Sequence, residues 1–376
     1  MKRQRIAQVT LSMGQGGIEN LLISLVSKQD KTKYQTYVYC LDYGGELIGS
    51  IESLGAIVRI FDRSPGLDFR LIFRLATKFR EDKIEIVHTH NEAAHFYGCL
   101  AARLAGIRHV INTEHSRHYL EGHWRRKLEK RFLALLTRKI VAVSEELQQA
   151  SIELDGISPA RLSVVLNGVD LDRFTSVSSI EKQEIRTRLN FKAVDKIIII
   201  VARLNPIKNH EMLIRAFARL YVEQSKLRLV IVGDGELRSE LETLVGQLNI
   251  SHRVCFLGDR IDVPDLLRMS DVLVLCSHRE GLPLILLEGM AAQIPIVVTP
   301  GANKSLIVEH RVTGYVCDAT EEALADEIQL VLNELGTETV VTAGRRLVEE
   351  KYSIEQTVNA YDTLYRQLRT KRAANV

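Results

Sequence analysis

The stretch Lys196-Ile-Ile-Ile-Ile-Val-Ala-Arg-Leu-Asn-Pro-Ile-Lys-Asn209 decides the fold class of this chain. Its run of β-branched residues predicts a strand over Lys196–Val201, and the polar residues that follow predict a loop at the end of that strand. Arg203 and Lys208 lie in this loop. A planar guanidinium and a flexible ammonium together can clamp a diphosphate, although solvated surface charge is the ordinary alternative for both residues.

Similar β-branched runs alternate with amphipathic helical patterns along all 376 residues. This alternation predicts right-handed βαβ units and parallel sheets, that is, an α/β fold of two Rossmann-like domains facing a cleft. A polar stretch at 176–184 predicts the boundary, with domains at 1–176 and 177–352 and a C-terminal helix in 353–376 that packs back toward the N-terminal domain. The predicted strands are Ile6–Thr10, Tyr34–Leu41, Ile57–Phe61, Ile84–Thr89, Val110–Thr113, Ile140–Val143, Ser163–Leu166, Lys196–Val201, Leu227–Val232, Val254–Leu257, Val272–Leu275 and Ile294–Thr299.

The composition excludes several classes of protein. Apolar residues make up 46% of the chain, and no apolar run approaches the roughly 18 residues that span a bilayer. The five cysteines are scattered and include no C-x-x-C pair, so we expect neither a disulfide framework nor a zinc knuckle. A reducing cytoplasm is the expected setting.

In open parallel sheets, ligands bind at the carboxyl ends of the strands, so polar residues directly after strands are the candidates for a site. The first predicted strand runs into Met13-Gly-Gln-Gly-Gly-Ile-Glu-Asn20. Gly16 and Gly17 in this turn open a helix and could present free N–H groups to a phosphate, or they could simply permit a tight turn with positive φ. The turn is not a dinucleotide fingerprint, because the last glycine of that motif would fall on Glu19.

Histidine is concentrated in one part of the chain, where seven of the eleven lie between residues 88 and 123. His88 and His90 end a strand, and His115 follows the next one. No spacing among them matches a metal signature, so we expect no metal site. We interpret His115 as a hydrogen-bond donor to a polar substrate, and His118 and His123 as solvated surface residues.

The segment Ser277-His-Arg-Glu-Gly-Leu-Pro-Leu-Ile-Leu-Leu-Glu-Gly289 is the most informative one. Pro283 suits the first turn of a helix, so Glu280 is expected in the preceding loop and Glu288 along the helix. A carboxylate in so apolar a run needs a polar partner, which sugar hydroxyls would supply.

Glu280 and Glu288 form an E-x7-E pair after an S-x-x-E-G-x-P turn, and this pattern resembles the donor-sugar motif of glycosyltransferase family 4. The resemblance covers nearly the whole chain. The other motifs that carry it are G-G-x-E at Gly16–Glu19, V-S-E at Val143–Glu145, L-N-G-V-D at Leu166–Asp170, A-R-L-x-x-x-K at Ala202–Lys208 and V-G-D-G at Val232–Gly235.

The resemblance implies a GT-B fold and transfer of a sugar from a nucleotide donor with retention of configuration. The first domain would bind the acceptor and the second the nucleotide sugar, as a co-substrate and without a cofactor or metal. Arg203 and Lys208 would neutralise the diphosphate, and His115 would contact the sugar near the reacting carbon. The donor-binding residues that it implies are Glu280 for the sugar hydroxyls, Glu288 for the ribose, Gly16 and Gly17 for the phosphates, and the turn residues Gly233, Gly281, Leu282 and Pro283.

The chain departs from the family's pattern at two places, and two rival functions have to be compared with a glycosyltransferase. Asp170-Leu-Asp172 is formally a D-x-D, the metal signature of another transferase fold, but it lies in the family's N-G-V-D turn. Ala202 replaces the family's usual glycine. The rivals are a nucleotide-sugar epimerase of the same architecture and a degenerate sugar-nucleotide-binding subunit, but a degenerate subunit should have lost Arg203, Lys208 or Glu280. UDP is expected as the nucleotide on family frequency alone.

The segment Arg117–Lys139 contains eight basic and two acidic residues. Within it, Trp124–Leu136 has apolar residues at helical spacing with basic residues around them, so it could lie on an anionic membrane near a lipid-linked or glycan acceptor. The alternative is an ordinary helix packed on the sheet with a charged outer face. The basic stretch has no nucleic-acid module around it, so no nucleic-acid partner is expected. We therefore expect a cytoplasmic protein, which lies at the inner face of the membrane if the basic helix binds lipid. The expected role is in cell-surface polysaccharide assembly.

Overall fold

Strand β8 (Lys196–Val201) forms where the isoleucine run predicts it, at the centre of the second of two parallel sheets. The structure is a computed structural model, and it describes residues 3–115, 124–223, 226–334 and 336–370. The chain forms two compact units, one made of residues 1–167 together with 354–376 and one made of Gly168–Ser353. The chain therefore passes between units after Asn167, nine residues before the position that the polar stretch suggests.

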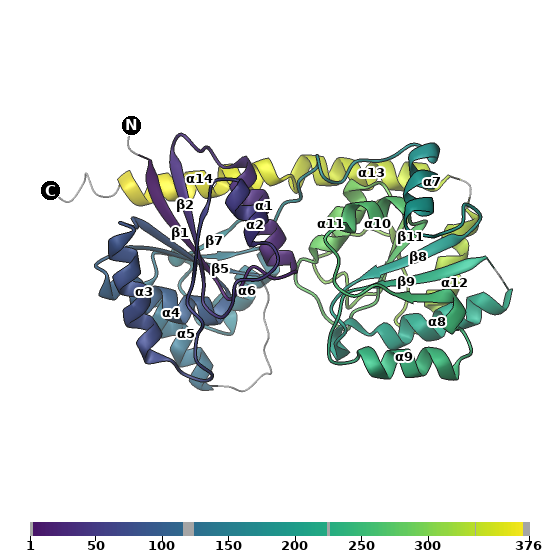
Figure 1. Cartoon of the computed structure of the whole chain (residues 1–376), viewed down its shortest axis with the longest axis horizontal. Helices are drawn as coiled ribbons and strands as arrows, with labels where there is room; N and C mark the ends of the chain where they lie inside the picture. Colours follow the sequence, from purple (N-terminus) through teal and green to yellow (C-terminus); the bar gives the residue numbers. More distant parts are fainter. Residues whose placement is uncertain (1–2, 116–123, 224–225, 335, 371–376) are drawn as a thin grey trace. The chain divides into compact units, whose positions relative to one another are not determined.

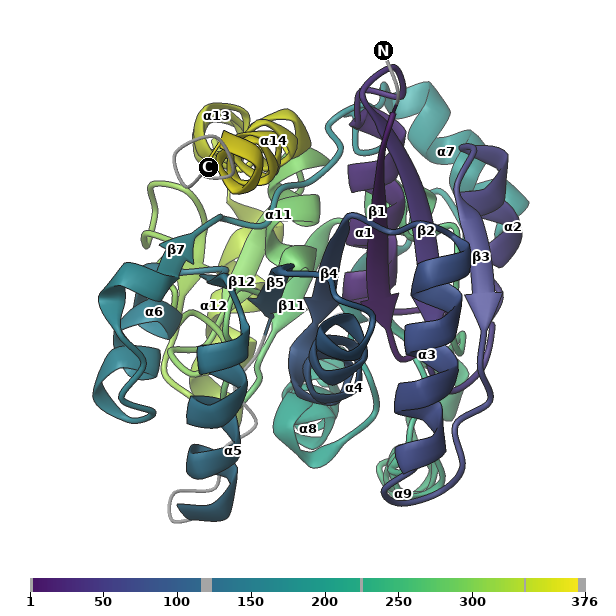
Figure 2. The same cartoon turned by 90° about the vertical axis from the view of Figure 1, so that its left-hand side faces the viewer.

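The first unit is built on a seven-stranded parallel sheet in the order β3-β2-β1-β4-β5-β6-β7. Helices α3, α4 and α5 lie side by side on one face of this sheet, and α1 packs against α14 on the other (Figure 2). The strands are β1 (Gln4–Thr10), β2 (Tyr34–Cys40), β3 (Ile57–Ile60), β4 (Ile86–His90), β5 (His109–Glu114), β6 (Lys139–Ala142) and β7 (Leu162–Val164). The helices are α1 (Gly17–Lys28), α2 (Ile48–Ser53), α3 (Phe69–Glu81), α4 (Asn91–Leu104), α5 (Trp124–Leu136), α6 (Glu145–Glu153) and α14 (Ile354–Thr370).

The second unit has a six-stranded parallel sheet in the order β10-β9-β8-β11-β12-β13. Its core lies between this sheet and helices α8, α9 and α12, while α7 packs on α10 and α11 on α13 (Figure 1). The other strands are β9 (Leu227–Val232), β10 (Val254–Phe256), β11 (Val272–Leu275), β12 (Ile296–Val298) and β13 (Tyr315–Val316). The helices are α7 (Ser179–Arg188), α8 (His210–Glu223), α9 (Arg238–Gln247), α10 (Val263–Met269), α11 (Leu284–Ala291), α12 (Glu321–Asn333) and α13 (Thr337–Lys351).

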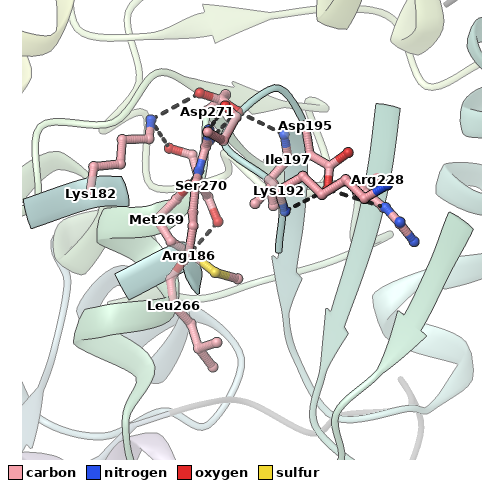
Figure 3. Close-up of polar contacts among 11 residues, drawn as sticks. Lys182, Arg186, Lys192, Asp195, Ile197, Arg228, Leu266, Met269, Ser270 and Asp271 are labelled. Atoms are coloured by element: carbon pink, nitrogen blue, oxygen red, sulfur yellow. Dashed lines mark hydrogen bonds and ion pairs between the residues drawn. The ribbon is translucent and has the colours of Figure 1, made fainter. Parts of the chain in front are cut away.

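The polar stretch at 176–184, which the sequence suggested as a break between domains without strand or helix, contains the start of α7, so that interpretation is wrong. Ser178 and Glu181 form a capping box, in which the Ser178 side chain accepts from the Glu181 backbone and the Glu181 carboxylate accepts from the Ser178 backbone. An S-x-x-E pattern of this kind is a helix-start signal. Tertiary contacts then hold α7, because Lys182 and Arg186 both pair with the partly buried Asp271 (Figure 3).

None of the helices within the described ranges is both long enough and apolar enough to span a membrane.

Candidate functional site

Each sheet has one point where the strand order reverses direction, and the candidate residues gather at the carboxyl ends of the strands beside it. In the second unit this point lies between β8 and β11, and in the first unit between β1 and β4. The helices that follow such neighbouring strands lie on opposite faces of the sheet, which leaves a crevice for a ligand at the strand ends.

Lys208 and Glu280 meet across the reversal point of the second unit. Lys208 ends a short 3₁₀ helix (Pro206–Lys208) after β8, and Asn205 begins that helix by accepting from the Lys208 backbone N–H. Glu280 lies in the loop after β11, and its Oε1 is 2.5 Å from the Lys208 Nζ. Two residues that the sequence analysis assigned to different tasks therefore form an ion pair.

The Glu280 carboxylate is oriented by its own loop as well. The Ser277 hydroxyl donates to Glu280 Oε1 at 2.6 Å, and the Glu280 backbone N–H donates to the carbonyl of Gly301, after β12. A Cβ on Gly301 would lie 2.4 Å from the His278 carbonyl oxygen, so the close approach of the two loops requires a glycine there. Ser277 was not among the predicted site residues, although its place in the S-x-x-E pattern was the available signal.

Arg203 also follows β8, but its side chain is 73% exposed and its Nη2 lies 3.9 Å from Glu236 Oε2. It is therefore free to reorient toward an incoming anion. A weak pair of this kind contributes little to stability.

Glu288 lies on α11, where the sequence pattern placed it. Burial raises the pKa of the Glu288 carboxyl to about 7, and the nearby charge of Arg173 opposes this shift. The residues before α11 form a turn in which Leu282 and Pro283 are buried, and Pro283 is the N-cap of the helix. Gly281 is half-buried at the start of this turn.

The backbone conformation and packing after β9 require a glycine at position 233. Its φ is +122°, and a Cβ there would lie 2.2 Å from the Ala202 carbonyl oxygen in the loop after β8. Its N–H donates to the Gly258 carbonyl at 2.8 Å. Packing of the two loops alone accounts for this glycine, and a contact with a donor stays a prediction.

In the first unit, Gly16 is the N-cap of α1, with an extended φ of −157° and no side-chain capping bond, and Gly17 is the first helical residue. The alternative that Gly16 serves a turn of positive φ is therefore wrong. A Cβ on Gly16 would lie 2.3 Å from Glu19 Oε2. The Glu19 carboxylate therefore lies at the helix start, where it accepts from its own backbone N–H, and a phosphate contact at this turn stays a prediction.

His88, His90 and His115 lie together at the carboxyl ends of β4 and β5. His90 Nδ1 is 3.0 Å from His115 Nε2, and the two rings are stacked 5.3 Å apart. Burial, with the charge of His115 as a smaller cause, lowers the pKa of His88 to about 3, and burial lowers that of His115 to about 4. Burial also lowers the pKa of His90 well below its usual range. All three imidazoles are therefore neutral at pH 7.

Across the described parts of the chain, no three His, Cys, Asp or Glu side chains are arranged to hold a metal ion. His118 and His123, expected on the surface, lie outside the described residues.

Helix α5 buries Lys130, Leu133 and Ala134 in the first unit and exposes an apolar stripe among charged residues. Trp124, Leu128, Phe132 and Leu135 are 53–67% exposed, whereas Lys130 is only 8% exposed. The alternative of an ordinary helix packed on the sheet is confirmed in part, because Leu133 and Ala134 are buried and Arg125, Arg126 and Arg131 are exposed. The exposed apolar stripe is what that alternative did not predict. The grouping of Lys130 with the outer basic residues is wrong, because its ammonium is buried near the carboxylates of Glu92, Glu114 and Asp155.

Comparison with known proteins identifies the family. Residues 181–357 match the family described as glycosyl transferases group 1, and residues 15–173 match glycosyltransferase family 4. The first match covers most of the second unit, and the second match covers most of the first unit.

Among curated proteins, the chain is 31% identical over 266 residues to an Escherichia coli UDP-Gal:alpha-D-GlcNAc-diphosphoundecaprenol alpha-1,3-galactosyltransferase, covering 68% of this chain and 67% of that one. It is 28% identical over 308 residues to the N-acetyl-alpha-D-glucosaminyl L-malate synthase of Bacillus anthracis, covering 80% and 79%.

Among solved structures, Anabaena Alr3699/HepE in complex with UDP and glucose has a TM-score of 0.82 at 19% identity, over 97% of this chain and all of that one. A glycosyltransferase from Rickettsia africae has a TM-score of 0.80 at 19% identity, over 98% and 99%. These likenesses establish the GT-B fold. With both family matches and the Escherichia coli relative, the chain belongs to glycosyltransferase family 4 and is a glycosyltransferase of group 1 type.

Proposed function

We propose that this protein transfers a sugar, with retention of anomeric configuration, from a UDP-linked donor to a lipid-linked or glycan acceptor in cell-surface polysaccharide assembly. The observation that carries the proposal is the Lys208–Glu280 pair at the β8–β11 reversal point. Lys208 and Glu280 bring a cation beside a carboxylate, and a sugar joined to a diphosphate carries an anionic group beside hydroxyls, so the pair supports a donor of this kind. The Escherichia coli relative, whose name specifies a UDP-Gal donor and a diphosphoundecaprenol acceptor, supports this choice of substrates.

In this proposal the leaving diphosphate is stabilised by side chains and requires no metal ion. Lys208 and the mobile Arg203 bring two positive charges to the phosphate oxygens as the bond to the sugar breaks. The acceptor hydroxyl attacks from the face that the diphosphate leaves, so no glutamate acts as a covalent nucleophile. The departing phosphate accepts the proton of that hydroxyl.

Other residues position the donor. Glu280 accepts from hydroxyls of the transferred sugar, and Glu288 accepts from the ribose. The turn at Gly281, Leu282 and Pro283 and the glycine at Gly233 keep the backbone near the donor. Gly16 and Gly17 contribute N–H groups to the phosphates, and His115 contacts the transferred sugar.

A binding screen tests the donor. The full chain is titrated with UDP-, GDP-, ADP- and CMP-sugars, first with EDTA and then with magnesium, and the melting temperature is followed. A bound donor raises it in proportion to the logarithm of its concentration above the Kd. We expect a shift with UDP-sugars that is equal with and without magnesium. The shift should be lost in Arg203→Ala and kept in Arg219→Ala, a matched control whose arginine is also exposed in the second unit. A shift with GDP-sugars alone, or only with magnesium, would contradict the corresponding part of the proposal.

The proposed site of action is the cytoplasmic face of a membrane, reached through α5. The buried side chains of α5 determine which face of the helix points outward. Lys130 is buried among carboxylates, and Leu133 and Ala134 pack inward. The Arg131 guanidinium also donates to the Asp155 carbonyl at 2.7 Å. With these residues inside, the apolar stripe of Trp124, Leu128, Phe132 and Leu135 must face outward. Exposed apolar side chains bordered by Arg125 and Arg126 suit an anionic lipid surface.

Co-sedimentation with vesicles tests the membrane contact. We expect binding to vesicles with 30% phosphatidylglycerol at low salt, and weakening by about a hundredfold or more in a Leu128→Glu/Phe132→Glu double variant. Each of the two apolar side chains contributes roughly 1.5–3 kcal/mol when it is buried in the bilayer. Both side chains are exposed, so the melting temperature should stay the same. Ile180→Glu, at another exposed apolar residue, is the control. Equal binding of all three proteins, or none by the wild type, would refute the contact.

A further inference from the structure

A cavity of about 260 Å³ lies in the first unit, between the C-terminal end of α1, the loop that leads into β2, and α14. Its lining includes Tyr34, the first residue of β2, and Gln8 on the neighbouring strand β1. The strands of this sheet are parallel, so the loop before β2 lies at their amino ends. The candidate residues described above follow the carboxyl ends, and the cavity is therefore separate from their site.

The size of the cavity suits a small ligand. A cavity of roughly 150 Å³ holds one benzene molecule, and pockets for drug-sized ligands begin at roughly 300 Å³. A volume of about 260 Å³ therefore fits a single six-membered ring with substituents. Lys33 and Asn359 are exposed and mark the entrance, whereas Gln8, Tyr361 and Tyr365 are at most 3% exposed and form the inner wall.

The charges that line the cavity cancel. Its charged lining residues are two of each sign, namely Lys28, Lys33, Asp30 and Asp362. Lys33 and Asp30 pair with each other at 2.8 Å, and the other lysine and aspartate pair with Glu355 at 3.2 Å and Arg366 at 2.6 Å respectively. An ionic ligand would have to break one of these pairs or lie in the cavity without a counter-charge, and both are unfavourable. The lining therefore favours a neutral ligand.

Two side-chain amides supply neutral hydrogen-bonding groups. Gln29 Oε1 accepts from the Thr36 hydroxyl, and its Nε2 bonds to none of the described residues. The side-chain amide of Asn359 also has no partner among the residues that the structure describes. An amide N–H₂ donates and an amide oxygen accepts. A ligand with hydroxyl groups, which do both, therefore matches these two residues.

Three tyrosine rings give the cavity an aromatic side. Tyr34 and Tyr365 meet edge to face with ring centres 5.8 Å apart, and Tyr361 stacks on Tyr365 at 6.2 Å. The three hydroxyls already bond to other side chains of the first unit, so the tyrosines offer ring surface to a ligand. The face of an aromatic ring is negative and attracts C–H groups with partial positive charge, such as those of a sugar ring.

The inner wall of the cavity is joined to the histidines at the carboxyl ends of β4 and β5. Gln8 Nε2 donates to Tyr365 Oη at 3.3 Å, and Gln8 Oε1 lies 2.9 Å from His90 Nε2. His90 Nδ1 is in turn 3.0 Å from His115 Nε2. A ligand that packs against Gln8 and Tyr365 therefore contacts the side chains that are hydrogen-bonded to His90 and, through it, to His115.

We infer that this cavity is a second saccharide site, which binds one neutral sugar ring against Tyr34, Tyr361 and Tyr365 and hydrogen-bonds its hydroxyls to Gln29 and Asn359. A sugar in the cavity contacts α1, the loop before β2 and α14 at once. The site is independent of the donor and acceptor of the proposed function, so that either can fail without the other.

Free sugars test the site without any nucleotide. The full chain is titrated calorimetrically with glucose, galactose and mannose, and then with the 6-phosphate and the uronic acid of the sugar that binds. For a ligand of this size we expect a Kd of about 1 mM for at least one neutral sugar, and binding about tenfold weaker or less for both charged analogues. Tighter binding of a charged analogue would overturn the inference. So would the absence of binding by all three sugars at concentrations about twentyfold above this Kd.

A blocking variant locates the bound sugar. Asn359→Trp places an indole at the entrance and should abolish binding. Thr363→Trp, at an exposed residue of α14 that does not line the cavity, is the matched control and should bind as the wild type does. Both positions are exposed, so the melting temperature should stay the same. If Asn359→Trp proves unstable, Lys33→Trp blocks the same entrance from the loop before β2. Binding that survives in a folded blocking variant would rule out this cavity.

Amide hydrogen exchange locates the sugar independently of any substitution. A sugar in the cavity should slow exchange in peptides from 21–36 and 354–370, which include the lining residues of α1, β2 and α14, and leave peptides from 277–291 in the second unit unchanged. Slower exchange in 277–291 instead would place the sugar at the candidate donor site and overturn the inference.

Methyl glycosides distinguish two sources of the sugar. A unit within a glycan carries a substituent on its anomeric oxygen, whereas a free sugar does not. Equal binding of a sugar and its methyl glycoside is what a glycan unit requires, and binding of the sugar without its glycoside identifies a free metabolite. Either result supports a saccharide site in the cavity.

Discussion

Lys208 and Glu280 are 72 residues apart in the sequence, and each is held in place by a neighbour in its own loop. Asn205 fixes the turn that carries Lys208, and Ser277 fixes the Glu280 carboxylate. Such support from adjacent residues keeps a charged pair in one geometry before any ligand arrives, which is the condition for electrostatic stabilisation of a transition state.

We expect Glu280→Gln to lower kcat/KM roughly 100-fold, because it removes the negative charge that holds Lys208 and weakens the hydroxyl contacts. The fold should be retained, since glutamine has nearly the same shape. Initial rates with the donor found in the binding screen measure the effect. Glu242→Gln, at an exposed glutamate paired within α9, is the matched control and should keep full activity. Wild-type rates in Glu280→Gln would refute the assignment of this residue.

Glu288 should make donor binding depend on pH. Burial raises the pKa of its carboxyl to about 7 in the free protein, and ribose hydroxyls that donate to it favour the ionised form. Binding therefore strengthens as pH rises through about 7, and the Kd of the nucleotide sugar should fall severalfold between pH 6 and pH 8. The diesterified diphosphate of that ligand does not titrate in this range. Calorimetric titration measures the change, and a Glu288→Gln variant should show a flat profile. The same slope in both proteins would assign the dependence to another group.

At the scale of elements, α5 and α7 are each held by buried charge. The α5 side chain that enters the first unit is Lys130, and burial raises the pKa of its partner Glu114 while the Lys130 charge opposes the rise. In α7, Lys182 and Arg186 reach Asp271 at the start of β11, and Asp271 also accepts from the backbone N–H of Ile197 (Figure 3). The inward faces of the two helices carry the apolar residues Leu133, Ala134 and Ile185 beside these charged residues, so the ion pairs add to the apolar contacts.

Removal of the Asp271 charge should therefore destabilise the second unit. We expect Asp271→Asn to lower its free energy of unfolding by about 2 kcal/mol, because the buried Arg186 and the partly buried Lys182 lose their counter-ion. Chemical denaturation measures this loss, and Asp326→Asn on the exposed side of α12 should change stability by less than about 0.5 kcal/mol.

The same carboxylate gives a pH dependence of defined sign. Burial acts to raise the pKa of Asp271, but Lys182, Arg186 and the Ile197 N–H outweigh it and hold the pKa below its usual range. Its contribution is therefore fully present above the unfolded-state pKa of about 4 and is lost as pH falls through the folded-state value. The gap in stability between wild type and Asp271→Asn should narrow below about pH 4. A constant gap down to pH 2 would contradict this account.

At the scale of the whole chain, the first unit is assembled from two distant segments. After Ser353 the chain returns as α14, whose Tyr361, Leu364, Tyr365 and Leu368 are buried in the first unit, and Thr357 donates to the Leu166 carbonyl at 2.9 Å. At roughly 1.5–3 kcal/mol for each buried side chain, α14 contributes about as much as the entire stability of a typical domain.

Fragments of the chain should reflect this division. We expect residues 168–353 to unfold cooperatively on their own, and residues 1–167 to be soluble and folded only when residues 354–376 are supplied, either fused through a flexible linker or as a peptide. Circular dichroism and thermal melts distinguish the cases. The control peptide carries Tyr361→Ser and Leu364→Ser and should not rescue the fragment. Cooperative folding of 1–167 by itself would show that α14 is dispensable.

The local sequence pattern was sufficient to predict the bounds of several strands and the loops and helices in which the candidate residues lie. β8, β9 and β11 have the bounds that their β-branched runs predict, and Glu280 and Glu288 lie in the loop and the helix that Pro283 indicated. Strand β13 has only two residues and carries too little pattern to be recognised. Helix α7 was missed although its capping box was visible, because a polar helix has no apolar periodicity.

The sequence by itself determined the alternation of strands and helices, the family, and the residues that follow each strand, since these depend on side-chain type at short spacing. Only the tertiary structure decided which distant residues meet. It paired Lys208 with Glu280, turned the apolar stripe of α5 outward by burying Lys130, and linked His115 through Gln8 to Tyr365 on α14. Periodicity cannot supply these results, because the burial of a charge and the hydrogen-bond partners of an imidazole depend on residues that are remote in the chain.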